Sequence, residues 1–140
     1  MIFCYDIDST RRYARVELSG SVHGSDIAET LRALYRDSRW RPGFDTVWDS
    51  SSTTELIIDM DDLAYLAGLQ IEYQQISGRG RDVILAVRPI DSAMAQIYAF
   101  HAKGGPRPTY IVTQESEVGQ VLGATRFQGD ETCSTDKRLI

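Results

Sequence analysis

The residues best suited to bind a ligand or a partner follow predicted strands. A hydroxyl-rich stretch that begins with Asp49, Ser50 and Ser51 comes directly after a short apolar run. Asp91 follows a second apolar run, 82–87. Ligands of open α/β sheets bind outside the carboxyl ends of the strands, so we expect these four residues to form one contact site. A solvated loop whose side chains cap the local backbone is the competing interpretation.

Three aspartates crowd the predicted start of a helix. Asp59 and Asp62 have the spacing of a capping box, in which two side chains accept hydrogen bonds from free backbone amides. Asp61 lies between them, and a helix N-terminus favours negative charge by ~0.3–1 kcal/mol. These side chains either only cap the helix, or Asp59 and Asp61 also contact a partner.

The sequence contains no recognisable catalytic set. Its two histidines are His23 and His101. His101 could act as a general base beside Asp49 or Asp91, but no paired nucleophile accompanies it. His23 and nearby Asp26 supply too few ligands for a metal ion. No serine-hydrolase, zinc-protease, P-loop or dinucleotide motif occurs. We therefore predict no enzyme, no catalytic residue, no cofactor and no metal.

Composition excludes several classes of partner. The 140 residues include 15 Lys and Arg against 20 Asp and Glu, a net charge of -5, whereas nucleic acid binding needs a basic face. No apolar run approaches the ~20 residues that span a bilayer, and no signal-peptide pattern opens the chain. Cys4 and Cys133 are expected to be free thiols. A cytoplasmic protein with no membrane insertion is predicted.

Apolar periodicity predicts five strands and four helices in the order β-β-α-β-α-β-α-β-α. The expected strands are 2–8, 13–18, 46–49, 82–87 and 109–112, and the expected helices are 25–39, 59–77, one between Asp91 and Gly104, and 116–122. This order predicts an α/β domain with a mixed, mostly parallel five-stranded sheet and an N-terminal antiparallel hairpin. Residues 1–124 would form this single domain, and residues 125–140 a mobile C-terminal tail.

Seven segments, in this order, are similar to those of a known family. They are Leu18–Val22, Trp40–Asp45, Val47–Asp49, Asp59–Leu66, Val83–Val87, Ala95–Tyr98 and Val118–Leu122. Together they resemble the STAS domain, the fold of bacterial anti-sigma-factor antagonists. More closely, the chain resembles small bacterial STAS-like proteins of uncharacterised function, grouped alongside the Sec14-type lipid-transfer fold.

The resemblance also bears on regulation. In the antagonists, a serine at the start of the second helix is phosphorylated within an Asp-Ser-Ser-Gly-Leu pattern. Here the stretch reads Asp59-Met60-Asp61-Asp62-Leu63. Asp61 stands at the phosphorylated position, so the resemblance implies a permanent negative charge instead of a phosphoserine switch. Aspartate carries one charge where phosphate carries about two.

Two functions remain open from the sequence. The first is a non-catalytic regulatory module of STAS-like fold that contacts a protein partner or a second copy of itself. The second is a small-molecule or lipid carrier with an apolar pocket between sheet and helices. Tyr65 and Tyr73, eight residues apart on one helix side, could line such a pocket or a homodimer face.

Overall fold

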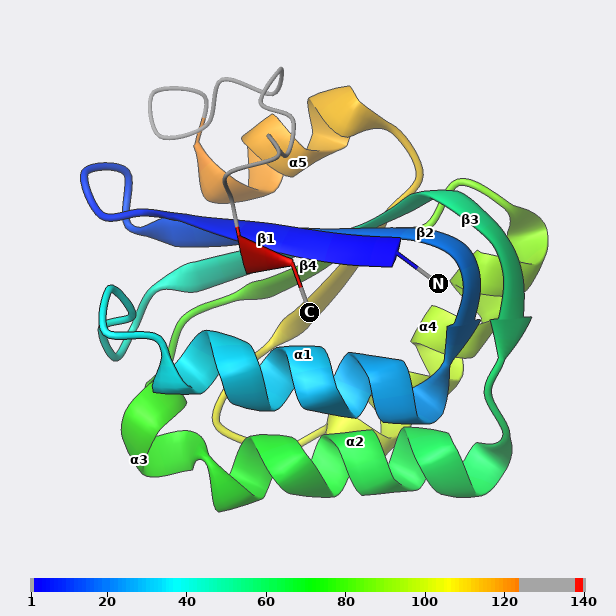
Figure 1. Cartoon of the computed structure of the whole chain (residues 1–140), viewed down its shortest axis with the longest axis horizontal. Coiled ribbons are helices and arrows are strands. Elements are labelled where there is room, and N and C mark those ends of the chain that lie inside the picture. The colour runs from blue at the N-terminus through cyan, green and yellow to red at the C-terminus, as the bar shows by residue number, and fades with distance from the viewer. Residues whose placement is uncertain (1, 124–137, 140) are drawn as a thin grey trace.

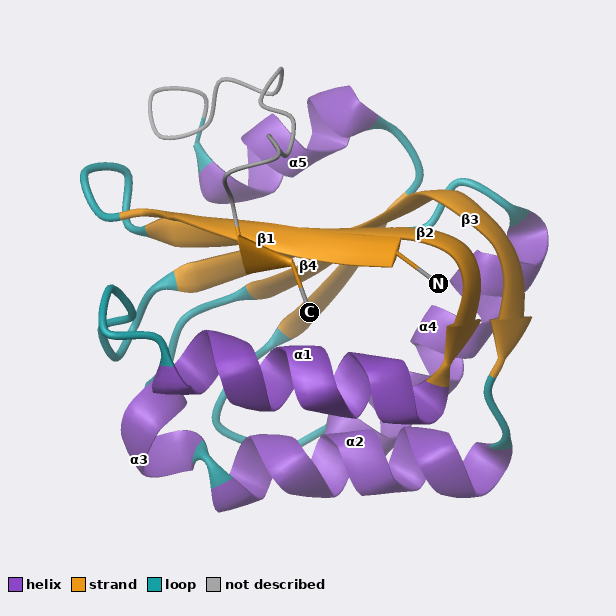
Figure 2. Ribbon diagram, in the orientation of Figure 1, coloured by secondary structure: helices purple, strands orange, loops and turns teal. Residues whose placement is uncertain are grey.

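One mixed sheet organises the chain. The computed structural model describes residues 2–123 and 138–139. Within them the strands run in the order β5-β4-β3-β2-β1-β6 (Figures 1 and 2). They are β1 (Ile2–Asp8), β2 (Tyr13–His23), β3 (Asp45–Ile57), β4 (Asp82–Leu85), β5 (Thr109–Val112) and β6 (Arg138–Leu139). β1 and β2 form the expected antiparallel hairpin, and β2 to β5 are parallel. The mixed, mostly parallel sheet is confirmed, with β6 as an additional edge strand.

Helices cover both faces of this sheet. They are α1 (Gly24–Arg36), α2 (Met60–Glu72), the short α3 (Gln74–Ser77), α4 (Pro89–Ala102) and α5 (Glu115–Leu122). α1, α2 and α4 lie on one face and α5 lies on the other (Figure 2). We call these the three-helix face and the α5 face.

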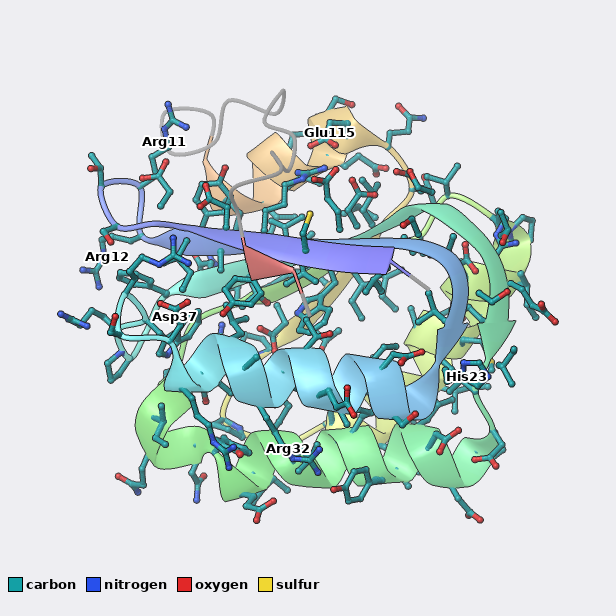
Figure 3. The ribbon with its side chains drawn as sticks, viewed as in Figure 1. Arg11, Arg12, His23, Arg32, Asp37 and Glu115 are labelled. Atoms are coloured by element: carbon teal, nitrogen blue, oxygen red, sulfur yellow. The ribbon has the colours of Figure 1, made fainter. Side chains whose placement is uncertain are left out.

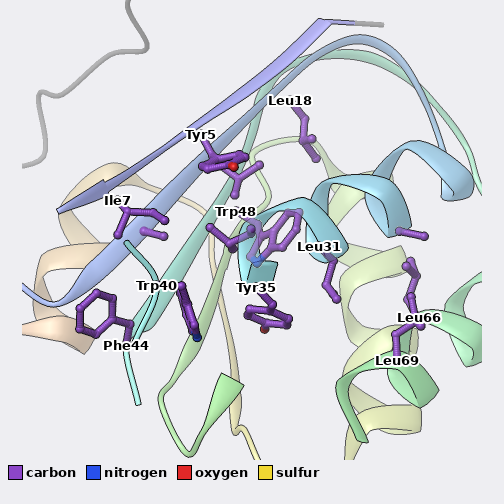
Figure 4. Packing of buried hydrophobic residues seen from close by; sticks show 14 of the residues in the cluster. Tyr5, Ile7, Leu18, Leu31, Tyr35, Trp40, Phe44, Trp48, Leu66 and Leu69 are labelled. Atoms are coloured by element: carbon purple, nitrogen blue, oxygen red, sulfur yellow. The ribbon is translucent and has the colours of Figure 1, made fainter. Parts of the chain in front are cut away.

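A separate hydrophobic core lies on each face. The larger core packs the three-helix face against the sheet and contains several aromatic side chains, among them Tyr5, Tyr35 and Trp48 (Figure 4). The smaller core lies under α5 and includes Val47 and Val118. Successive side chains of a strand point to opposite faces, and neighbours Val47 and Trp48 of β3 accordingly belong to different cores.

Because helices cover both faces of the sheet, β2 is more buried than the sequence predicts. The alternation of apolar and charged residues from Tyr13 to Leu18 predicts a half-buried strand. In the structure this segment is almost entirely buried, and even the Arg15 side chain is only 7% exposed. α5 covers the face to which Arg15 belongs, and carboxylates there pair with its guanidinium.

β2 and β3 are longer than predicted. Residues 20–24 and 50–54, which lie outside the predicted elements, largely continue these strands, because the two backbones pair in parallel as far as His23 and Ile57. Two register shifts interrupt the pairing, and Gly20 there has a φ of 73°, a conformation that glycine adopts without steric cost. The two strands bend together toward α1 and α2 (Figure 1).

The helix predicted over 59–77 is divided. Tyr73 leaves the helical conformation, with a φ of -93° and a ψ of 7°, so α2 ends and α3 follows. The indole of Trp40 donates to the Ile76 carbonyl at 3.0 Å. Gly78 ends α3 with a φ of 76°, and a Cβ there would lie 2.3 Å from the Gly43 nitrogen. Close packing against residues 40–43 thus fixes this corner.

The C-terminal prediction is only partly within the described residues. The expected mobile tail, 125–140, falls mostly on residues outside them. Arg138 and Leu139 form β6 and pair with Tyr5 and Cys4 of β1. Cys4 is disulfide-bonded, so the expectation that it is a free thiol is wrong. Cys133 lies outside the described residues.

Candidate functional site

A cavity of about 110 Å³ lies between the sheet and the three-helix face. Its walls are mostly aliphatic and aromatic, with side chains from β2, β3, β4, α1, α2 and α4. Figure 4 shows Leu31, Trp48 and Leu66 of this lining, which come from α1, β3 and α2. The polar lining residues are Ser50, Gln70, Asp82, Asp91 and Tyr98.

A buried ion pair adjoins the cavity. Arg107 donates from Nε to Asp82 Oδ1 at 2.8 Å, and the two side chains are 0% and 4% exposed. The other guanidinium nitrogens of Arg107 donate to the backbone carbonyls of Ser77 and Phe44 at 2.8 and 2.6 Å. Thr46 Oγ1 also donates to Asp82 Oδ1, at 2.6 Å. These bonds compensate the desolvation of both charges, which burial requires.

Gln70 links this ion pair to two tyrosines. Its amide nitrogen donates to Asp82 Oδ2 at 3.3 Å, and its amide oxygen accepts from the Tyr35 hydroxyl at 3.0 Å. Burial, with a smaller contribution from the negative charge of Asp82, raises the pKa of both Tyr35 and Tyr98 above the ordinary value. Both hydroxyls therefore stay neutral at physiological pH, and the tyrosines act as hydrogen-bonding groups.

The predicted site residues in the middle of β3, Asp49, Ser50 and Ser51, point to different faces. Asp49 accepts from Arg15 Nη2 at 2.8 Å, and Arg15 also pairs with Glu115 of α5 at 2.7 Å. Figure 3 shows Glu115 on the α5 face. Ser51 donates its backbone N–H and its hydroxyl to Asp49 at 2.9 and 2.6 Å. Ser50 lines the cavity on the three-helix face instead, and donates to the Leu85 carbonyl at 2.8 Å.

Asp91 is also in the cavity lining. It lies in the first turn of α4, is 3% exposed, and pairs with Arg88 through two hydrogen bonds of 2.9 and 2.7 Å. Pro89 occupies the start of this helix, where its missing N–H costs nothing. Ser50 and Asp91 thus line one cavity, whereas Asp49 lies across the sheet from both.

Asp59 and Asp61 lie at the exposed start of α2. Asp59 is the N-cap and accepts from the Asp62 amide at 2.8 Å, while Asp62 accepts from the Asp59 amide at 3.0 Å. The predicted capping box is therefore confirmed. Asp61 is exposed in the same turn. At α1, the N-cap is His23.

Large apolar side chains are exposed near the start of α2. Figure 1 shows that the end of β3, the first turn of α2 and the first turn of α4 lie at the same end of the molecule. We define the carboxyl-edge surface as the exposed residues Ile57, Asp59, Met60, Asp61, Val87 and Ile90. Its four apolar side chains are between 43% and 57% exposed.

The structure does not bring together the residues considered for catalysis, which are Asp49, Asp91 and His101. Asp49 lies on the α5 face and Asp91 on the three-helix face. His101 is exposed near the end of α4, with its ring 5.8 Å from that of Phe100. Within residues 2–123 and 138–139, no group of three His, Cys, Asp or Glu side chains is placed to hold a metal ion.

Comparisons support the fold. No family model matches the sequence, and no curated protein is significantly similar to it. The structure is similar to that of the anti-sigma factor antagonist SpoIIAA in its unphosphorylated form, with a TM-score of 0.50 and 18% identity. The match covers 86% of this chain and 98% of that chain. The STAS-like fold that the sequence predicts is thereby confirmed. No helix among the described residues is long and apolar enough to span a membrane.

The sequence did not reveal the buried network of Arg107, Asp82 and Gln70. Each residue is separately ordinary: an arginine in a Gly- and Pro-rich connector, an aspartate opening a strand, and a glutamine on a helix. Asp82 and Arg107 are 25 residues apart and meet only because β4 and β5 pair side by side. The one available signal was an aspartate at the start of an otherwise apolar strand.

Proposed function

We propose that this chain is a non-catalytic regulatory module that binds a protein partner through the carboxyl-edge surface. The observation that carries the proposal is the exposure of Ile57, Met60, Val87 and Ile90 at one end of the molecule. Exposed apolar patches rimmed by polar groups mark interaction sites.

Charge indicates the kind of partner. Asp59 and Asp61 add exposed carboxylates to the apolar side chains. Complementary charge raises the association rate and suppresses wrong partners. We expect a protein segment that carries basic residues beside apolar anchors.

The fold supports a regulatory role. SpoIIAA, a solved protein of similar structure, is named as an antagonist of another protein. α2 contains no serine or threonine, so a phosphoserine switch in this helix is not available. We propose that Asp61 supplies a permanent negative charge instead, and that partner binding needs no kinase.

A cytoplasmic location stays a prediction. The expected free thiols are one of its grounds, whereas Cys4 is disulfide-bonded, and disulfides persist mainly in oxidising compartments. The proposed contact surface does not depend on which compartment holds the protein.

Site-specific photo-crosslinking tests the proposal. A photoreactive residue is placed at Met60, in cells that make the protein, and the control carries it at Ile76. Ile76 is 43% exposed but lies on α3, at the other end of α2 (Figure 1). We expect a crosslinked product from position 60 alone, and its loss with Asp61→Lys. Equal products from both positions, or no effect of Asp61→Lys, would reject the surface. A crosslink to a second copy would show a homodimer interface.

The alternative of a carrier concerns the cavity. An engineered cavity of about 150 Å³ accommodates benzene, so a volume of about 110 Å³ matches a single ring and does not match a lipid. Lipid carriage is therefore not proposed.

A further inference from the structure

We propose that the cavity on the three-helix face binds a small uncharged ring compound with one hydrogen-bond donor, of the phenol class. The cavity uses residues other than those of the carboxyl-edge surface, so this binding goes beyond the proposed partner contact. The inference rests on the cavity's volume, its walls, and the state of its polar groups.

The walls favour a ring without charge. Leu18, Leu31, Trp48, Leu63 and Met94 are among the apolar lining residues. Cavities with apolar walls hold no water, so an apolar molecule of matching size binds there favourably. Aromatic rings also favour packing against an indole such as that of Trp48.

The charged groups of the lining are already paired. Asp82 pairs with Arg107, and Asp91 pairs with Arg88. Arg107 directs its nitrogens to Asp82 and to backbone carbonyls, so its hydrogen-bonding capacity is spent within the protein. A charged ligand would lose its hydration without finding an opposite charge, and burial of an unpaired ion is costly.

Two side chains of the lining, Asp82 and Ser50, can each accept one more hydrogen bond. Asp82 Oδ1 already accepts from Thr46 and Arg107, but Oδ2 accepts only the long 3.3 Å bond from Gln70. Since a carboxylate oxygen can accept two hydrogen bonds, Asp82 Oδ2 can take a ligand donor. Ser50 gives its proton to the Leu85 carbonyl, so its oxygen is also left as an acceptor. A ligand hydroxyl fits this arrangement.

The direct test uses nuclear magnetic resonance titrations of the full chain with phenol, benzene and benzoate. The reporter is the indole N–H of Trp48, which lines the cavity and donates to Thr46 Oγ1 at 3.1 Å. The internal control is the indole of Trp40, which packs against Phe44 and is not in the lining.

We expect phenol to shift the Trp48 signal saturably and to leave Trp40 nearly unchanged. Benzene should bind about tenfold more weakly, because it lacks the hydrogen bond to a charged acceptor. Benzoate should not bind. A Trp48 signal that does not move with phenol, or that moves equally with benzoate, would overturn the proposal.

A pair of variants on α4 locates the binding. Ala95 lines the cavity and is 6% exposed, whereas Ala93 is exposed on the same helix. Ala95→Phe should fill the cavity and abolish the phenol response, and Ala93→Phe should preserve it. If Ala95→Phe does not fold, the smaller Ala95→Leu should weaken binding at least tenfold. Unchanged binding in a folded Ala95 variant would overturn the proposal.

Discussion

At the scale of single residues, the Arg107–Asp82 pair joins the sheet to the chain around it. Arg107 reaches Ser77 and Phe44 as well as Asp82, and its guanidinium lies 5.6 Å from the centre of the Trp40 ring. One side chain thus connects the segment before β5 with β4, with α3 and with the turn before β3.

Arg107→Met tests the importance of this pair. Removal of one partner leaves Asp82 buried without its cation, and such losses cost about 3–5 kcal/mol. Urea unfolding followed by circular dichroism measures the loss. The control is Arg39→Met, because Arg39 is 44% exposed in its pair with Asp37, and exposed pairs contribute at most about 1 kcal/mol. Equal losses in both variants would contradict the role given to Arg107.

Asp37 makes stability depend on acid pH. Hydrogen bonds from Arg39, with one from the Tyr5 hydroxyl at 2.9 Å, lower the pKa of Asp37 to about 2. In the unfolded chain this pKa returns to about 4. The contribution of Asp37 is therefore complete above pH 4 and is lost as the pH falls toward 2.

We expect Asp37→Asn to lower the free energy of unfolding by about 1 kcal/mol at pH 7, after allowance for the solvent around Arg39. The difference from the unmodified chain should shrink between pH 4 and pH 2. Denaturant titrations at several pH values measure it. A difference that stays constant down to pH 2 would show that the carboxylate charge is not responsible.

Local residue patterns were the most informative part of the sequence. The capping box of Asp59 and Asp62 was predictable because its bonds lie within one turn. The separation of Asp49 from Ser50 is not predictable in this way, because the polar residues 50–54 have the composition of a loop although they belong to β3. In a strand, consecutive side chains point to opposite faces, so these neighbours could not share one site.

At the scale of elements, α2 presents the residues of the proposed contact. Its N-terminus packs close to that of α1: a Cβ on Gly24 would lie 2.6 Å from the carboxyl carbon of Asp62. The same Asp62 accepts from the Asp59 amide. The capping box therefore orients the exposed first turn, including Asp61, against α1.

Asp59→Ala and Asp61→Ala separate capping from contact. Loss of an N-cap side chain costs about 1 kcal/mol, so Asp59→Ala should lower the thermal midpoint of the protein by several degrees. Asp61→Ala should change the thermal midpoint little, because Asp61 is exposed in the first turn and is not the N-cap residue. Differential scanning calorimetry measures both. A larger loss for Asp61→Ala would show that Asp61 is structural, and would weaken its assignment to the partner surface.

The order and type of most elements could be predicted because they depend on local apolar periodicity. The pairing of residues 19–23 with 52–57 could not be predicted. The polar residues that extend these two parallel strands have the composition of a loop. The sequence also does not predict which helices cover which face of the sheet. This distribution depends on α5 crossing to the face opposite α1, α2 and α4 (Figure 2).

At the scale of the whole molecule, the two faces of the sheet differ in what covers them. The α5 face is closed by a small core and by the Arg15 ion pairs. The three-helix face contains the larger core and the cavity. The carboxyl-edge surface lies where β3, α2 and α4 meet at one end. The sequence predicts six contact residues, four of them in one site and Asp59 and Asp61 at a helix start, and the structure distributes the six over the α5 face, the cavity and this surface.

The most direct test of the central claim is the affinity of the crosslinked partner. Once mass spectrometry has identified that protein, its binding to the full chain is measured by calorimetry. Ile90→Asp is compared with Tyr110→Asp, because Tyr110 is 40% exposed on the edge strand β5 and is not one of the residues of the carboxyl-edge surface. We expect Ile90→Asp to raise Kd at least tenfold, as loss of a central apolar anchor does, and Tyr110→Asp to leave Kd unchanged. Equal values of Kd for both variants and the unmodified chain would contradict the claim.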